Sequence, residues 1–202
     1  MAIWTQILEQ LSQTSVVEFM AVITGILSVW FNKQEKILVY PFGIISVTLY
    51  IFIDYRCKLY ADSGINTYCL LMSLFGWYHW KNTKTGVDQI PISKSSKQQK
   101  MISLFTLLGA FVLLWIILRR FTDSDVPAWD ALTTAFAITG MYLMALKKVE
   151  HWYCWIGCNL SSIPLYTYKG LPLTGIQFIV FACIAISGLV SWKKKLLDLE
   201  SR

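Results

Sequence analysis

Seven apolar runs follow one another along the chain, and short polar or charged segments separate them. A helix needs about 20 apolar residues to cross the ~30 Å of hydrocarbon in a bilayer, and most of the runs approach that length. The runs cover residues 16–31, 37–53, 64–80, 101–118, 128–146, 149–166 and 173–192. This pattern predicts an all-α integral membrane protein with seven transmembrane helices.

The composition agrees with a surface that is solvated by lipid. Of the 202 residues, 55% are hydrophobic and only 15% are charged, against a charged share of about 25% in soluble domains. Such a chain is too apolar to be disordered. The net charge of +6 lies in short clusters between the apolar runs, which is typical of basic loops beside a membrane. We therefore expect the lipid bilayer, and no nucleic acid, as a partner.

The Lys and Arg residues predict an orientation in the membrane. If all seven runs span it, thirteen of the 18 Lys and Arg residues fall on the side of the C-terminus. These are Lys33, Lys36, Lys81, Lys84, Lys94, Lys97, Lys100, Lys147, Lys148, Lys193, Lys194, Lys195 and Arg202. The other side holds Arg56, Lys58, Arg119, Arg120 and Lys169. Because basic residues are enriched in cytoplasmic loops, we expect a cytoplasmic C-terminus and an N-terminus outside.

The chain also resembles itself at an offset of 112 positions. The third and seventh runs both end in G-x-x-x-W-K, beginning at Gly76 and Gly188, and Glu18 at the start of the first run matches Asp130 at the start of the fifth. The offset predicts a first three-helix repeat at 16–80, a loop and linker helix at 81–127, a second repeat at 128–192 and a basic cytoplasmic tail at 193–202. A single linker helix makes the two repeats parallel, a layout (3 + 1 + 3) known among transporters, with the pathway between the repeats.

The sixth run carries the most informative polar pattern. Trp152, Trp155 and Asn159 stand at positions i, i+3 and i+7, so a helix places them on one face. Two indoles and a carboxamide suit a flat ring, because the indoles stack on it and attract positive charge while the amide bonds its edge. The alternative is that the Trp pair belongs to the interfacial aromatic belt and Asn159 joins two helices.

Three further polar residues within the runs are weaker candidates for the same site. Asn66 in the third run and Gln177 in the seventh are one position away from the 112-residue offset, and Tyr50 lies in the second run. Ordinary helix packing is the stronger explanation for each of them taken singly. They become candidates as substrate-binding residues because two of them are near-equivalent in the two repeats.

The sequence offers no set of metal ligands and no enzyme motif. Cys154, Cys158 and His151 are close together, but His79 is the only other histidine and no second Cys/His pair completes a site. The carboxylates Glu18, Asp54, Asp130 and Glu150 lie at the ends of runs, whereas an ion-coupled pump needs them at depth. We expect free thiols, no metal, no cofactor and no catalysis. A facilitator is favoured over a membrane-bound ligand sensor or an integral-membrane enzyme.

Several motifs together resemble the PnuC family of vitamin transporters. They are the W-x-x-W-x-x-x-N pattern of the sixth run, Tyr40-Pro41-Phe42-Gly43, Leu59-Tyr60-Ala61-Asp62 and Gly76-Trp77-Tyr78-His79-Trp80. The resemblance runs from about Glu18 to Lys193. It implies a core similar to that of the SWEET sugar transporters, a bacterial inner-membrane location, and substrate binding by Trp152, Trp155 and Asn159. It allows a homotrimer.

The resemblance further implies uptake of nicotinamide riboside or a related vitamin by facilitated diffusion, followed by trapping through a cytoplasmic kinase. Thiamine, which the relative PnuT transports, is the alternative substrate because both molecules carry a flat cationic ring. Riboflavin is neutral and bulkier and is ranked lower.

Overall fold

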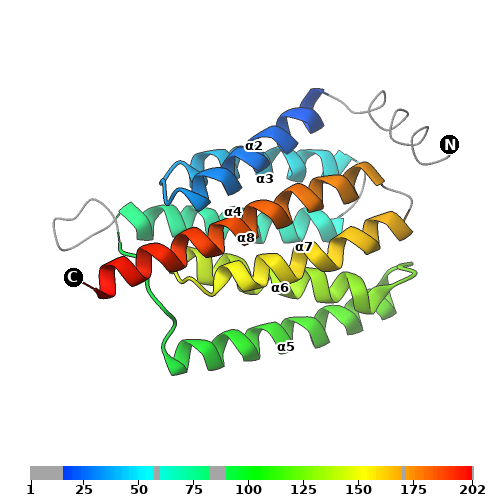
Figure 1. Ribbon diagram of the computed structural model, residues 1–202. Helices are drawn as coiled ribbons and strands as arrows, with labels where there is room; N and C mark the ends of the chain where they lie inside the picture. Colours follow the sequence, from blue (N-terminus) through cyan, green and yellow to red (C-terminus); the bar gives the residue numbers. More distant parts are fainter. Residues whose placement is uncertain (1–15, 57–59, 82–89, 170–171, 202) are drawn as a thin grey trace. The chain divides into compact units, whose positions relative to one another are not determined.

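The computed structural model describes residues 16–56, 60–81, 90–169 and 172–201. Within them the chain forms seven helices and no strand (Figure 1). The helices are α2 (Val16–Lys33), α3 (Val39–Arg56), α4 (Tyr60–Lys81), α5 (Lys97–Phe121), α6 (Pro127–Ala145), α7 (His151–Tyr168) and α8 (Pro172–Glu200). Each matches one apolar run, so the expected all-α fold of seven helices is confirmed. Leu59 of the family motif, and Lys58, Lys84 and Arg202 of the charge distribution, lie outside the described residues.

Three of these helices are long and apolar enough to cross a membrane by length and composition alone: α2, α5 and the Thr174–Leu199 part of α8. Val39–Ile53 of α3 is apolar but shorter. Helix α8 continues through the segment that we expected to be a basic tail, and ends at Glu200.

The chain forms two compact units, residues 1–90 and 91–202. In unit 1, α2 packs against α3 and α3 against α4. Two hydroxyl groups join α2 to α3: Ser28 Oγ donates to the Val39 carbonyl at 2.7 Å, and Ser46 Oγ donates to the Ala21 carbonyl at 2.8 Å. Small residues and hydroxyls of this kind let membrane helices approach closely.

In unit 2, α5 packs against α6, α6 against α7 and α7 against α8. The contact between α6 and α7 uses larger groups than its counterpart in unit 1. Trp129 Nε1 donates to the Ser161 carbonyl at 2.9 Å, and the ring of Phe136 lies against Gly157. Helix α5 has no buried residue, as expected of a linker helix with a lipid-facing surface.

The turns before α3 and α7 have the same backbone geometry at the 112-residue offset. Glu35 and Lys147 both have positive φ angles, of 59° and 54°. The Lys36 N–H donates to the Phe31 carbonyl and the Lys148 N–H to the Leu143 carbonyl, both at 3.0 Å. The same turn in each unit shows that the sequence repeat has a structural counterpart.

A second correspondence joins the aromatic residues to the glycines of the G-x-x-x-W-K motifs. Tyr40 meets Trp80 edge-on at 5.1 Å between ring centroids, and Trp152 meets Trp192 edge-on at 5.7 Å. A Cβ added at Gly76 would lie 2.5 Å from the Tyr40 ring, and one added at Gly188 would lie 2.5 Å from Trp152. The two glycines therefore leave the space that each buried ring fills.

Candidate substrate site

Helix α7 presents the tryptophan and asparagine side chains at one side of unit 2. It begins directly after the turn at Lys147, so the turn determines which face of the helix meets α6 and α8. Three of the predicted residues, Trp152, Trp155 and Asn159, lie along this helix, and their surroundings differ.

Trp152 lies at the contact between α7 and α8. It is 0% exposed, meets Trp192 edge-on and lies against Gly188. Its Nε1 is buried, and no hydrogen-bond partner for this atom exists among the described residues. In this conformation Trp152 has no open ring face, and its position holds α7 against α8.

Trp155 lies one turn further along α7, at the contact with α6. Its side chain is half-buried. A Cβ added at Gly140 would lie 3.3 Å from Trp155 Cε2, so the absence of a side chain at Gly140 allows the indole to lie close to α6. Unlike Trp152, this indole keeps part of its surface accessible to a ligand.

Asn159 is the most informative polar side chain of α7. It is only 4% exposed, and it is not among the described residues that have a fully buried polar atom without a hydrogen-bond partner. It stands four residues after Trp155, and therefore on the same face of the helix. Its carboxamide offers both a donor and an acceptor beside the Trp155 indole.

Gln177 belongs to α8 and is half-buried. The turn geometry gives a repeat offset of 112, so the counterpart of Asn66 is Phe178 and not Gln177. Phe178 stacks on Tyr166 of α7 at 5.1 Å. The near-equivalence of Asn66 and Gln177 is therefore a displacement by one position, which on a helix turns the side chain through about 100°.

Tyr50 and Asn66 belong to unit 1, on α3 and α4. Both side chains are half-buried and both take part in interactions. Ser46, which also belongs to α3, bonds to α2 and serves the packing of that helix pair.

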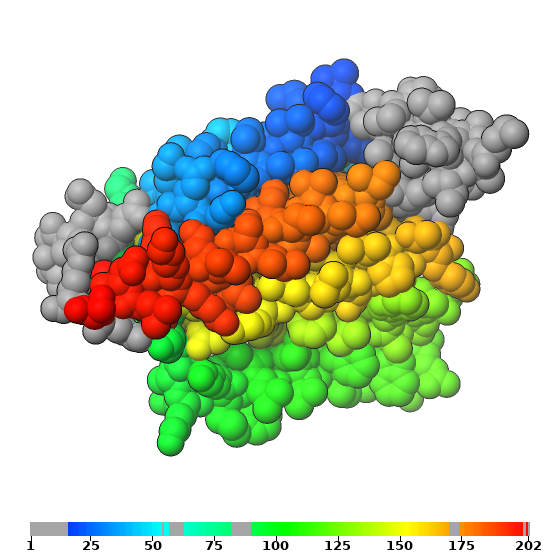
Figure 2. Space-filling view, viewed as in Figure 1, coloured from blue at the N-terminus to red at the C-terminus, as the bar shows by residue number. Residues whose placement is uncertain are grey.

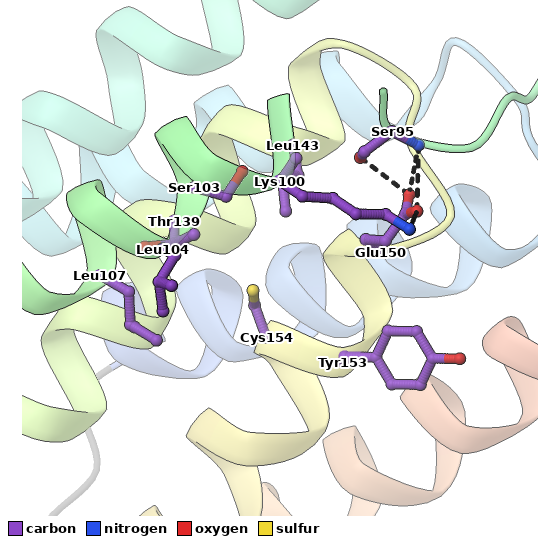
Figure 3. Close-up of a pocket in the computed structure, with 10 residues that line it drawn as sticks. All are labelled: Ser95, Lys100, Ser103, Leu104, Leu107, Thr139, Leu143, Glu150, Tyr153 and Cys154. Carbon is purple, nitrogen blue, oxygen red and sulfur yellow. Dashed lines mark hydrogen bonds and ion pairs between the residues drawn. The ribbon is translucent and has the colours of Figure 1, made fainter. Parts of the chain in front are cut away.

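Two features that the sequence did not indicate are the role of Gly140 beside Trp155 and a pocket beside α7. The pocket has a volume of about 200 Å³ and lies among α5, α6 and α7 (Figure 3). It includes Cys154 but none of the six predicted binding residues. Only the tertiary contact of α5 with α6 creates it.

Comparison with known proteins identifies the family. Residues 15–194 match the sequence profile described as nicotinamide mononucleotide transporter. The chain belongs to this family.

Relatives of this transporter cover most of its length. The nicotinamide riboside transporter PnuC of Escherichia coli is 23% identical, over 92% of this chain and 88% of that protein. PnuC of Neisseria mucosa is 28% identical over 86% and 70%. The riboflavin/roseoflavin transporter RibM of Streptomyces davaonensis is 20% identical over 84% and 81%. A crystal structure of the vitamin B3 transporter PnuC matches with a TM-score of 0.72 at 25% identity, over 95% of this chain and 87% of that one.

These matches confirm the expected PnuC-type membrane transporter, which is not an enzyme. Within the described ranges, no three His, Cys, Asp or Glu side chains gather where they could hold a metal ion. His151 Nδ1 lies 2.6 Å from the Lys148 carbonyl, and its ring packs on Trp152 and Trp192. The contacts of His151 therefore stabilise the first turn of α7 and its packing on α8. Cys154 and Cys158 are free thiols.

Proposed function

We propose that this transporter carries nicotinamide riboside across a bacterial inner membrane by facilitated diffusion, and that a cytoplasmic kinase then traps the substrate by phosphorylation. Two of the relatives described above are named nicotinamide riboside transporters. The observation that carries the proposal is the position of Asn159, which is 4% exposed and lies one turn from the half-buried Trp155 indole on the same face of α7.

Each site residue has a proposed role that follows from its chemistry. Nicotinamide is a flat cationic ring with a carboxamide, and Trp155 offers an indole face to such a ring. Asn159 both donates to and accepts from the carboxamide at the ring edge. Trp152 fixes the direction of α7, so it supports the site through Trp155 and Asn159. Gln177 of unit 2, and Tyr50 and Asn66 of unit 1, stay predictions from the sequence.

The positions of the acidic residues support uncoupled transport. Glu18 and Asp130 stand in the first turns of α2 and α6, Asp54 stands two residues before the end of α3, and Glu150 stands just before α7. All four are at helix ends, whereas a coupling carboxylate would be needed at depth. The substrate gradient, maintained by phosphorylation inside the cell, then drives net uptake.

The repeated turn and the repeated aromatic contact support a 3 + 1 + 3 organisation, in which α2–α4 and α6–α8 are parallel repeats joined by α5. The excess of Lys and Arg on one side supports a cytoplasmic C-terminus. A cysteine introduced near each terminus and tested with a membrane-impermeant thiol reagent would check this orientation. Labelling of the C-terminal cysteine from outside intact cells would show that the orientation is the opposite of the proposed one.

Purified protein in liposomes tests the function. We expect labelled nicotinamide riboside to reach equal concentrations inside and outside without ATP or an ion gradient. Accumulation above the outside concentration would exclude facilitated diffusion. Adding thiamine as a competitor decides between the two cationic vitamins: strong inhibition together with transport of labelled thiamine would make thiamine the substrate on the same site. Saturable binding without any flux would indicate a ligand sensor.

A homotrimer is the proposed oligomeric state. The mass of the protein–detergent complex from light scattering would test it, since a monomer of 23.2 kDa is readily separated from a trimer.

A further inference from the structure

The pocket among α5, α6 and α7 is separate from the six candidate substrate residues and has an amphiphilic lining. Leu104 and Leu107 of α5 and Leu143 of α6 line it with hydrocarbon. Lys100, Glu150 and Ser95 gather at one end (Figure 3). Ser103 and Thr139 lie beside Leu104, but their hydroxyls donate to the Gln99 and Ala135 carbonyls of their own helices at 2.8 and 2.9 Å. Charged groups at one end and a mainly apolar surface along the rest match a molecule with a charged head and an apolar chain.

The exposed apolar surface of α5 favours a hydrocarbon chain as the occupant of this pocket. Leu104 is half exposed and no residue of the helix is buried. The outer surface of α5 (green) is not covered by the other helices of unit 2 in the space-filling view (Figure 2). The pocket is open on one side. In a bilayer, an apolar concavity on an uncovered helix lacks the polar partners that water needs and is filled by an acyl chain.

The charges at the head end favour an anion. The Glu150 carboxylate accepts hydrogen bonds from the Ser95 N–H at 3.0 Å and from Ser95 Oγ at 2.9 Å. Lys100 Nζ is 4.0 Å from this carboxylate and its side chain is 62% exposed. Lys193 Nζ lies 5.3 Å from the ring centroid of Tyr153, which also lines the pocket. Among the lining residues, the Glu150 carboxylate is bonded to Ser95, while the ammonium group of Lys100 is exposed to a phosphate. Lys193 does not line the pocket, and adds a positive charge beside Tyr153.

We infer that an anionic phospholipid binds here, with its phosphate at Lys100 and Lys193 and one acyl chain along Leu104 and Leu107. Basic pockets between transmembrane helices are the recurrent way in which membrane proteins bind anionic head groups. The inference needs only the membrane-spanning fold and does not depend on which vitamin the transporter carries.

Native mass spectrometry of the delipidated full chain tests the site, with dioleoyl-phosphatidylglycerol and dioleoyl-phosphatidylcholine as matched probes. We expect the anionic lipid to be retained more strongly, and Lys100→Gln to lower its retention about five-fold, the effect of one lysine near an anionic head group. Lys97→Gln removes the same charge from an exposed residue of α5 that does not line the pocket, and should leave retention unchanged.

A second pair of variants tests the acyl chain. Leu107→Trp fills the pocket and should reduce retention of both lipids, whereas Leu108→Trp, on the exposed side of α5, should not. Equal retention of the two lipids by the wild type, or equal effects within either pair of variants, overturns the inference. Bound copies of the chain in place of lipid would assign the pocket to self-association and also overturn it. Loss of nicotinamide riboside transport with lipid retention intact would contradict only the proposed function.

Discussion

The α2–α3 contact of unit 1 and the α6–α7 contact of unit 2 are at equivalent positions, but different side chains meet there. In unit 1, Gly43 of α3 faces Ser28 of α2, and a Cβ added at Gly43 would lie 3.0 Å from Ser28 Oγ. The equivalent pair in unit 2 is Trp155 of α7 and Gly140 of α6, so the glycine lies on the second helix of the pair in unit 1 and on the first in unit 2. This difference brings an indole to α7 while the backbone turn before it stays the same.

Asn159 extends this difference by one more turn. Its counterpart in α3 is Val47, and the counterpart of Cys158 is Ser46, whose hydroxyl bonds to α2. Unit 1 therefore uses its equivalent positions for packing, whereas unit 2 has an indole and a carboxamide there. Under the proposed function, the repeated backbone is a scaffold and these positions of α7 carry the proposed substrate contacts.

The largest expected effect is on stability, at the glycine–aromatic contacts that the two units share. Gly188→Ala places a Cβ against Trp152, and Gly76→Ala places one against Tyr40, both at 2.5 Å. Because each ring is buried, we expect both variants to lower the free energy of unfolding by about 3 kcal/mol. Thermal unfolding in detergent measures it. Gly109→Ala is the control, since a Cβ at Gly109 meets nothing within 4 Å. If only one of the two variants is destabilised, the aromatic contacts are not equivalent.

The next largest effect is on ligand affinity, at the position where unit 2 has Asn159 and unit 1 has Val47. Asn159→Leu should weaken binding of nicotinamide riboside about tenfold, because one hydrogen bond to the ligand edge is lost. Val47→Leu, at the equivalent position of α3, should leave affinity within twofold. Calorimetric titration measures both. Unchanged binding by the Asn159 variant would mean that the amide serves helix packing.

A smaller effect separates the two tryptophans. Trp155→Phe should weaken binding about fivefold, since phenylalanine attracts a cation less strongly than an indole does by about 1 kcal/mol. Trp152→Phe should mainly lower the melting temperature, because Trp152 packs on Trp192 and Gly188. Binding and unfolding measured on both variants decide the assignment. If the Trp152 variant loses affinity at full stability, Trp152 itself contacts the substrate.

The smallest effect lies at the far end of α7. Lys169 Nζ binds Asp130 Oδ1 at 2.6 Å, and Ser124 Oγ donates to Asp130 Oδ2 at 2.7 Å. The ion pair is partly exposed, so Asp130→Asn should cost only about 0.5 kcal/mol of stability and leave transport unchanged. Chemical denaturation measures the loss. A strong transport defect in a stable variant would give this end of α7 a role in the transport cycle.

The sequence predicted the seven helices because the signals are local: each apolar run has the length and composition that a spanning helix requires. The repeat stays a prediction from the sequence, since G-x-x-x-W-K and the paired acidic residues recur at one offset. The turns and the aromatic contacts follow this offset where glycine and tryptophan mark it, whereas Asn66 and Gln177 differ from it by one position.

Only the tertiary structure distinguished the residues of the α7 stripe. Helical spacing places Trp152, Trp155 and Asn159 on one face, but it does not reveal which neighbouring helix covers each part of that face. Gly188 of α8 accommodates the fully buried ring of Trp152, while Gly140 lets Trp155 lie half-buried beside α6. These glycines are 36 and 15 residues away in sequence, so their effect depends on helix packing, which no local pattern encodes.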